Sequence, residues 1–363
     1  MTRHFYYTVL LTMMLNIIIN APMVLIGERF NGSLISMLLG VFVGGIFIYF
    51  FTIGISKFPN KGLPEIFNNR LPKLLKNTYL AFLGVMWLAA GAFVLISFTY
   101  ITVLYLITEL NMKYVLVFFL VIVIFGANNH TKSILNVIEI MVLIATPIVF
   151  FIVYKAMASK YFYFVHIKRI LHYFWQMPNY SSLSASTYFF IGYINLVILN
   201  RYLDTKKVVR FLWILPLIGL IVISFTFFVP IAFLGVKGVN DVVFPWIFIT
   251  DSLRMEYGFI ERVLYLMLYI FLLLSLLFGI LTWHVGLKLF EGMFFNYNLK
   301  PAKKRKFYGY MILLFFGVLT MILQMITNER ELFDLIKIWQ NIRFPAEVIL
   351  VGLIFFLSRR QRA

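Results

Sequence analysis

The chain has 363 residues, of which 62% are hydrophobic and only 13% charged, and its formal net charge is +18. This composition excludes a soluble domain of this length and indicates an integral membrane protein. The basic residues form clusters between apolar runs and do not follow one amphipathic face, so they indicate loops retained in the cytoplasm rather than a nucleic-acid-binding surface.

Ten apolar segments are candidates for transmembrane helices, because a helix needs about 20 residues to cross a hydrocarbon core of about 30 Å. They are 5–27, 33–55, 75–108, 113–126, 133–154, 184–203, 208–235, 257–290, 307–326 and 335–357. The first follows a short basic start without a small-residue cleavage site, so we interpret it as a spanning helix and not as a signal peptide.

Two similar stretches, half a chain length apart, indicate an internal duplication. PEIF at 64–67 and PWIF at 245–248 are 181 residues apart; a basic residue follows each at the same offset, and then an unusually long apolar run. Two halves of five helices must enter the membrane from opposite faces, because five is odd. We therefore expect an all-α membrane protein with one polytopic domain (1–363) and a 5+5 inverted repeat, the first unit at about 5–154 and the second at about 184–357.

The distribution of charges predicts the orientation. Placing both termini in the cytoplasm puts most Lys and Arg residues on that side, as the positive-inside rule requires. Most acidic residues, Glu347 among them, then lie on or near the outside. One external loop, 161–175, is rich in aromatic residues and carries Lys168, Arg169 and two histidines. We interpret it as an amphipathic helix in the outer interface, with docking of a partner as the alternative.

Interruptions in the first and sixth helices predict a pocket in mid-membrane, because a broken helix frees backbone groups that can bind a ligand. Pro22 has no N–H for a helical hydrogen bond, and the Asn20 side chain can take that place. We expect the pocket to hold a small zwitterionic or neutral polar molecule. The alternative is a proline kink and hydrogen bonds between helices, with no ligand. The candidate residues are Asn16, Asn20, Pro22, Gly192, Tyr193 and Asn195.

The two longest apolar segments add hydroxyl groups to this prediction. The third contributes Ser97 and Tyr100, and the eighth contributes Tyr269 and Ser275. Long helices of this kind line the pathway opposite the broken ones. The alternative is that the hydroxyls bond the carbonyl four residues earlier in their own helix.

Glu139 is the clearest acidic residue inside a predicted span. A carboxylate in lipid is costly, so it must face a cavity, form a pair or stay protonated. It is a candidate proton carrier; the alternative is a protonated acid, or one bonded to Asn136, near the cytoplasmic end of its helix.

The stretch 244–268 gathers most of the outward-side carboxylates, Asp251, Glu256 and Glu261. Asp251 and Arg254 are spaced to pair along one helical turn, whereas the adjacent Glu261 and Arg262 must point to different neighbours. We interpret these four residues as an outer gate or coupling element that moves with the pocket and faces a partner.

Other polar residues predict structure and not chemistry. Spacing places His284, Lys288 and Glu291 on one face of the eighth helix, where the last two are expected to form an ion pair. The sequence has no cysteine, and no zinc-protease, phosphate-loop or nucleophile-elbow motif. We therefore predict no enzyme, no metal site and no cofactor.

FPNKGLPEI at 58–66, together with FP at 244–245 and GFIER at 258–262, resembles motifs of the B subunits of spore germinant receptors, over essentially the whole chain. The resemblance implies the LeuT-like 5+5 fold of the amino acid, polyamine and organocation (APC) transporter superfamily. It also implies nutrient sensing in the inner membrane of the endospore, with an A subunit and a lipoprotein C subunit. Two positions depart from the family pattern: Leu264 replaces a frequent acidic residue, and Asn20-Ala21 stands where a glycine is usual.

These observations favour a subunit that senses a small nutrient, of the amino acid or nucleoside class, and passes a conformational change to its partners. A proton-coupled amino acid permease, with Glu139 as the proton carrier, is the alternative. A scaffold without a ligand is a third. The family motifs favour the first.

Overall fold

The computed structural model describes residues 3–68, 70–106, 109–255, 261–294 and 302–360, and over these ranges the secondary structure is helical apart from turns and one isolated bridge between Arg254 and Arg262. In chain order the helices are α1 (Arg3–Leu15), α2 (Ala21–Gly27), α3 (Ser33–Ser56), α4 (Leu63–Asn68), α5 (Lys73–Tyr105), α6 (Met112–Ala127), α7 (Thr131–Met157), α8 (Phe164–Leu171), α9 (Tyr180–Tyr188), η1 (Ile191–Asn195), α10 (Leu196–Leu199), α11 (Thr205–Val208), η2 (Val209–Phe211), α12 (Ile214–Leu234), η3 (Gly238–Asn240), α13 (Pro245–Ser252), α14 (Val263–Phe294), α15 (Ala302–Ile326) and α16 (Glu329–Arg359).

Seven of these helices are long and apolar enough to cross a membrane, or eight if the bent pair α9 and η1–α10 forms one span. The chain is therefore a multi-pass membrane protein. The two remaining segments of the predicted ten correspond to shorter helices: α6 has 16 residues, and the first segment is divided into α1 and α2. The count of ten spans stays a prediction.

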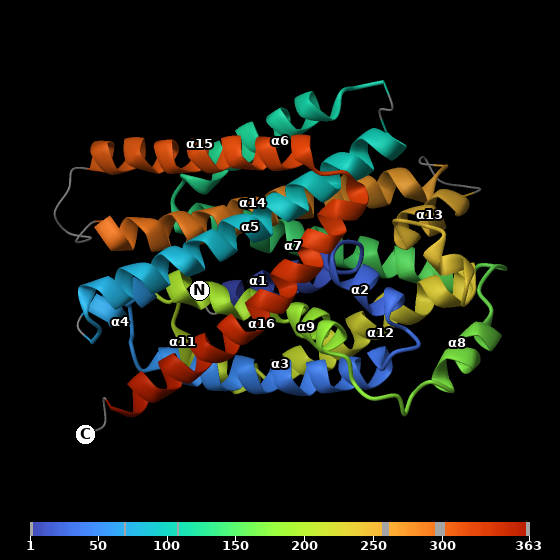
Figure 1. Ribbon diagram of the computed structural model, residues 1–363, viewed down its shortest axis with the longest axis horizontal. Coiled ribbons are helices and arrows are strands. Elements are labelled where there is room, and N and C mark those ends of the chain that lie inside the picture. The colour runs from blue at the N-terminus through green and yellow to red at the C-terminus, as the bar shows by residue number, and fades with distance from the viewer. Residues whose placement is uncertain (1–2, 69, 107–108, 256–260, 295–301, 361–363) are drawn as a thin grey trace.

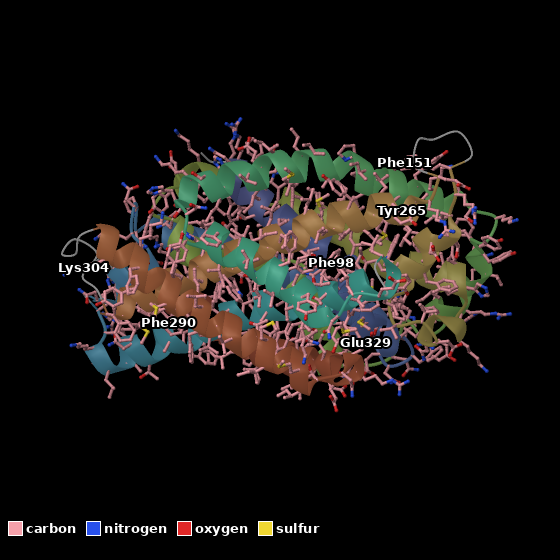
Figure 2. All side chains as sticks on the ribbon, turned by 90° about the horizontal axis from the view of Figure 1, so that it is seen from above. Phe98, Phe151, Tyr265, Phe290, Lys304 and Glu329 are labelled. Atoms are coloured by element: carbon pink, nitrogen blue, oxygen red, sulfur yellow. The ribbon has the colours of Figure 1, made fainter. Side chains whose placement is uncertain are left out.

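The long helices run roughly side by side, with α5 and α14 in the middle, α6 and α15 to one side and α3 and α12 to the other (Figure 1). The prediction that the third and eighth membrane helices exceed thirty residues is confirmed, since α5 has 33 and α14 has 32. They are antiparallel: a Cβ added at Gly84 would lie 2.5 Å from the Phe290 ring, while Gly279 faces Leu95. Figure 2 shows Phe98 of α5 in the middle of the molecule and Lys304 toward one end.

Both predicted helix interruptions are present. The first falls between α1 and α2, where Asn20 has a φ of 72° and Pro22 sits in the first turn of α2. The second is a bend of 60° between α9 and the η1–α10 segment. Proline in the first turn of a helix is tolerated because its missing N–H has no partner within the helix there. The chain therefore leaves helical geometry at 16–20 and resumes it at Ala21.

Prolines inside two other helices free carbonyl groups that side chains then use. Pro345 of α16 has no N–H for the Asn341 carbonyl, which instead accepts a hydrogen bond from the Tyr180 hydroxyl at 2.7 Å. In the same way Pro230 of α12 frees the Thr226 carbonyl, to which the Trp246 indole donates at 3.3 Å. Each kink is thus tied to a neighbouring element.

The segment 58–66 packs at one end of the bundle, where α4 and α11 lie in Figure 1. Glu65 accepts two hydrogen bonds from the Arg201 guanidinium, at 2.7 and 3.0 Å, and a third from the backbone N–H of Gly62. A Cβ at Gly62 would lie 2.7 Å from Arg201 Nε, so the ion pair needs a residue without a side chain there. The amide of Asn200 donates to two carbonyls of the same segment. These contacts explain why this loop needs its glycine and glutamate.

Helix α8 falls within the predicted amphipathic stretch, at the opposite end of the molecule from α4 (Figure 1). Ile170 is buried against the bundle, while Phe164 and Trp175 are exposed. Lys168 and Arg169 lie in its last turn. Exposed aromatic side chains beside a buried Ile170 suit the predicted interfacial helix, and its place in the membrane stays a prediction.

Candidate ligand-binding cavity

A cavity lies between the two interrupted helices, and α5, α14 and α16 complete its wall. It offers about 50 Å³ of room for the centres of water molecules, enough for a few waters or a small molecule. The wall is mostly apolar, with a small number of polar groups, which is the usual composition of a small-molecule site. Its polar lining residues are Thr12, Trp87, Tyr188, Asn195, Thr282, Trp339, Arg343 and Glu347.

A buried ion pair between Arg343 and Glu347, one helical turn apart near the middle of α16, forms part of this wall. Their side chains are 4% and 1% exposed. Glu347 also accepts a hydrogen bond from the Tyr193 hydroxyl at 2.6 Å, which links α16 to the interrupted sixth helix. A buried pair of charges needs such extra hydrogen bonds to offset the cost of leaving water.

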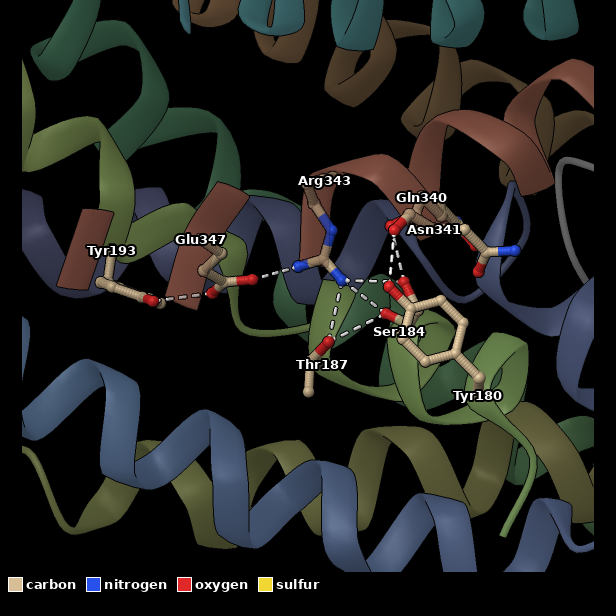
Figure 3. A network of polar contacts seen from close by, with 8 residues as sticks. All are labelled: Tyr180, Ser184, Thr187, Tyr193, Gln340, Asn341, Arg343 and Glu347. Atoms are coloured by element: carbon tan, nitrogen blue, oxygen red, sulfur yellow. Dashed lines mark hydrogen bonds and ion pairs between the residues drawn. The ribbon is translucent and has the colours of Figure 1, made fainter. Parts of the chain in front are cut away.

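The second guanidinium nitrogen of Arg343 holds the end of α9 (Figure 3). Its Nη2 donates to the Ser184 carbonyl at 2.6 Å and to the Thr187 hydroxyl at 2.8 Å. A cation near the C-terminus of a helix is favourable because the unpaired carbonyls there carry partial negative charge. Arg343 therefore joins α9, through its own helix and Glu347, to Tyr193 in η1.

Several buried polar atoms around the cavity have no hydrogen-bond partner among the described residues. Three belong to cavity-lining side chains, Tyr188 Oη, Trp339 Nε1 and Arg343 Nε. The Oδ1 atoms of Asn16 and Asn20 in the first interruption are also unpartnered. Buried polar groups are almost always satisfied in proteins, so such a group indicates a position where a ligand or water binds.

The three candidates from the sixth helix occupy different places. Asn195 lines the cavity, where its carbonyl oxygen accepts from the Trp87 indole at 2.8 Å and its amide donates to the Gly192 carbonyl. Tyr193 lies behind the wall and contacts Glu347. Gly192 packs against α1, since an added Cβ would lie 2.6 Å from the Thr8 carbonyl oxygen. One of the three therefore faces the cavity directly.

The candidates from the first helix lie at its interruption and do not line the cavity. The Asn16 amide donates back to the Thr12 carbonyl at 2.9 Å, and the Asn20 side chain lies beside the Tyr188 hydroxyl. Pro22 is buried in α2. The residue of this helix that reaches the cavity is Thr12, one turn before the interruption, which sequence reasoning did not single out.

The candidate hydroxyl residues of α5 and α14 do not gather at the cavity. Tyr100 donates to the Thr327 carbonyl at 2.7 Å, away from the cavity, while Ser97 and Ser275 are buried without a partner among the described residues. Tyr269 is 63% exposed, so it faces the surroundings of the bundle and its assignment to the pocket was wrong. Thr282, two turns beyond Ser275, is the α14 hydroxyl that lines the cavity.

Glu139 forms ion pairs with the N-terminal segment and does not line the cavity. Its carboxylate lies 2.7 Å from Arg3 Nε and 3.1 Å from His4 Nε2. Asn136, the partner considered from the sequence, accepts from His4 at 3.0 Å instead. The acid is therefore stabilised by basic groups of α1, and its role as a proton carrier stays a prediction.

We expect Glu139→Gln to lower the free energy of unfolding by about 1 kcal/mol or less, because Arg3 is largely exposed and water screens the pair. Ligand binding in the cavity should be unchanged. Thermal unfolding of the purified protein, with and without a stabilising ligand, measures both quantities. Asp204→Asn, which breaks the exposed pair with Lys207, is the matched control. Loss of the ligand-induced shift in Glu139→Gln alone would contradict this view.

The outer stretch folds differently from its predicted helical turn. Helix α13 ends at Ser252 and Leu253 is extended, so Asp251 and Arg254 do not share a turn and the predicted pairing was wrong. Arg254 instead pairs with Glu261 at 2.9 Å, and both side chains are well exposed. Glu256 and most of the GFIER motif lie outside the described residues. The gate assigned to this stretch stays a prediction.

The predicted ion pair near the far end of α14 is confirmed, with Lys288 Nζ 2.8 and 2.9 Å from the two Glu291 oxygens. The neighbouring His284 is buried and bonded to Thr131 and the Ala127 carbonyl. Among the described residues no cluster of His, Asp or Glu is suited to hold a metal ion.

Sequence reasoning missed the charges at the cavity. We expected Glu347 on or near the outside, and none of the candidate pocket residues named from the sequence is charged. The structure corrects both, because Glu347 and Arg343 are buried in the cavity wall. A signal was available. The two residues are four apart inside the predicted span 335–357, and an ionisable residue within a span marks a functional site by default.

Comparison with known proteins identifies one family. The family described as spore germination protein, a permease family, matches residues 4–332 of the chain. A search of curated proteins finds no match.

Proposed function

Because the chain belongs to this family of spore germination permeases, we propose that it binds a small polar nutrient in the central cavity and signals its presence to partner subunits. The nutrient is of the amino acid or nucleoside class. The observation that carries this proposal is the cavity itself, where unpartnered polar atoms and a buried ion pair surround a space between two interrupted helices.

The contacts of α16 supply a route from the cavity to the rest of the protein. A ligand that contacts Arg343 or Glu347 can alter the hydrogen bond from Tyr193 to Glu347 and the bonds from Arg343 to the end of α9. Both parts of the interrupted sixth helix are thus joined to the ligand-binding wall. A ligand changes an equilibrium between two arrangements only by binding one of them better, and we propose that these contacts differ between the two.

We further propose that the protein works in the inner membrane of the endospore with A-type and C-type receptor subunits. This rests on the family and on the motif at 58–66. In the structure that motif ties α4 to the end of the sixth helix through Glu65 and Arg201. Movement of the sixth helix would therefore also displace α4, at the end of the bundle that is predicted to be cytoplasmic.

A thermal-shift screen of the purified protein in lipid nanodiscs tests the binding proposal. The panel contains the twenty standard amino acids, inosine, adenosine and glucose, and we expect at least one to raise the unfolding midpoint. A ligand at 100 times its Kd should add about 2.7 kcal/mol to the free energy of unfolding. Ala346→Phe, which adds a ring to the cavity wall, should abolish the shift. Tyr269→Phe, at an exposed position, is the control and should keep it.

Two further measurements separate the alternatives. Spores carrying Ala346→Phe should lose their nutrient response, whereas a scaffold without a ligand would leave that response intact. Proteoliposomes should show no uptake driven by a pH gradient; uptake abolished by Glu139→Gln would favour a proton-coupled permease. If no compound in the panel shifts the midpoint, the proposal fails.

A further inference from the structure

Three buried hydrogen-bond donors lie in the cavity wall without an acceptor among the described residues. They are Arg343 Nε, Tyr188 Oη and Trp339 Nε1, and the three side chains are 4%, 1% and 8% exposed. All three residues line the same cavity. A buried donor without an acceptor is costly, so three around one cavity indicate that this wall is built to receive a group rich in acceptors.

The three side chains form one patch. The rings of Tyr188 and Trp339 are perpendicular, with centroids 5.5 Å apart, and Arg343 Cζ lies 5.4 Å from the Tyr188 centroid. The Phe93 ring, 5.9 Å from that of Trp339, supports the indole from α5. The donors therefore come from two elements, α9 and α16, whose relative position is fixed by the bonds from Arg343 to Ser184 and Thr187.

Both terminal nitrogens of Arg343 have partners. Its Nη1 is paired with Glu347 and its Nη2 is bonded to α9, whereas its Nε–H has no acceptor among the described residues. The charge of Arg343 is thus balanced by Glu347. An anion entering this wall gains charge-assisted hydrogen bonds, but it adds a net negative charge unless it carries its own cation.

Other parts of the wall have the opposite polarity. The hydroxyls of Thr12 on α1 and Thr282 on α14 donate to carbonyls of their own helices, at 3.1 and 2.8 Å. Their hydrogens are therefore occupied, and toward the cavity they offer lone pairs that accept hydrogen bonds. An ammonium group suits these positions. The cavity thus presents the three free donors on α9 and α16, beside a Glu347 carboxylate already bonded to Arg343 and Tyr193, and acceptors on α1 and α14.

We infer that Arg343, Tyr188 and Trp339 form a carboxylate subsite on the α9 and α16 side of the cavity, and that the preferred ligand is a zwitterion. This inference rests on the proposed function and narrows it, because nucleosides carry no carboxylate. It also assigns the recognition of the ligand to α16 and α9 rather than to the backbone of the first-helix interruption.

The test uses the full-length protein in nanodiscs and compares matched compounds by thermal shift and by calorimetry. The amino acid that stabilises most is measured beside its amide and the amine that lacks its carboxyl group. We expect both analogues to bind at least tenfold more weakly. Tyr188→Phe and Trp339→Phe should each weaken binding of the amino acid by about tenfold or more, because each loses a hydrogen bond to a charged group. Tyr188→Phe keeps the ring and should change the unfolding midpoint without ligand little, whereas Trp339→Phe also loses packing against Phe93 and should lower it. The loss of affinity in Tyr188→Phe therefore reports on the hydrogen bond alone.

The control is Tyr269→Phe, which removes an exposed hydroxyl outside the cavity and should leave every affinity unchanged. Equal affinity for the amino acid and its amide would overturn the inference, as would unchanged affinity in both Tyr188→Phe and Trp339→Phe. If inosine, adenosine or glucose binds in a manner abolished by Ala346→Phe and no amino acid does, the subsite is wrong while the proposed function stands. If nothing binds, both fail.

Discussion

Replacing Glu347 with alanine is expected to lower the free energy of unfolding by about 3–5 kcal/mol. The substitution leaves the Arg343 guanidinium buried without its counter-charge and deprives the Tyr193 hydroxyl of its acceptor. Since folded proteins are stable by only about 5–15 kcal/mol, the variant should accumulate poorly and unfold at a much lower temperature. Yield from membranes and the unfolding midpoint in nanodiscs measure the effect.

A double variant separates the cost of an unpaired charge from the value of the pair. Replacing a buried ion pair with apolar side chains of similar size is often neutral or stabilising, so Arg343→Met with Glu347→Leu should recover most of the lost stability. It should not recover ligand binding, because both charged groups line the cavity. A double variant as unstable as Glu347→Ala would show that the ion pair itself holds the helices together.

Replacing Gly192 with alanine should also be damaging. The new Cβ would lie 2.6 Å from the Thr8 carbonyl oxygen and from Val9 Cα, and 2.9 Å from Thr12 Oγ1. Two of these are backbone atoms of α1, so η1 and α1 would have to separate. Overpacking of this kind costs about 1–3 kcal/mol. The change should also weaken ligand binding, because Thr12 belongs to the cavity wall.

Gly352→Ala is the matched control for that experiment. Gly352 lies inside α16, is exposed, and has no atom within 4 Å of an added Cβ. Alanine there should raise stability by about 0.5–1 kcal/mol, because glycine is the poorer helix former. Thermal midpoints and ligand affinities measured in parallel give the comparison. If the two variants behaved alike, close packing of Gly192 on α1 would not matter.

The sequence was sufficient for the spanning helices because their signal is local. An apolar run of about 20 residues ends where charged residues begin, so the span predicted at 33–55 is observed as Ser33–Ser56. The interruptions were predictable for the same reason, since proline and glycine act on their own backbone. The seventh helix was predicted to begin at 208 but begins at Ile214, because the basic stretch before it folds into the short turns α11 and η2.

The lining of the cavity was less accessible, because it depends on which face of each helix is buried. Helix α14 is apolar all round, so no amphipathic stripe distinguishes Tyr269, which is exposed, from Thr282, which lines the cavity. Spacing arguments also assume an unbroken helix, and Asp251 and Arg254 failed to pair because α13 ends between them. The contact of Arg343 with Ser184 joins residues 159 apart in sequence, which spacing cannot reveal.

The proline of α16 bears on how this helix enters the bilayer during synthesis. An arginine at the centre of an inserting helix costs about 2.5–3.5 kcal/mol, and Pro345 leaves the Asn341 carbonyl without its helical partner. Glu347, four residues from Arg343, can neutralise the arginine within the same helix from the start. The freed carbonyl accepts a hydrogen bond from Tyr180, and the guanidinium donates to Ser184. Both residues belong to α9, which is synthesised before α16. The helix that is costly to insert is therefore synthesised after the helix that satisfies it, and we expect α16 to insert and dock against α9 together.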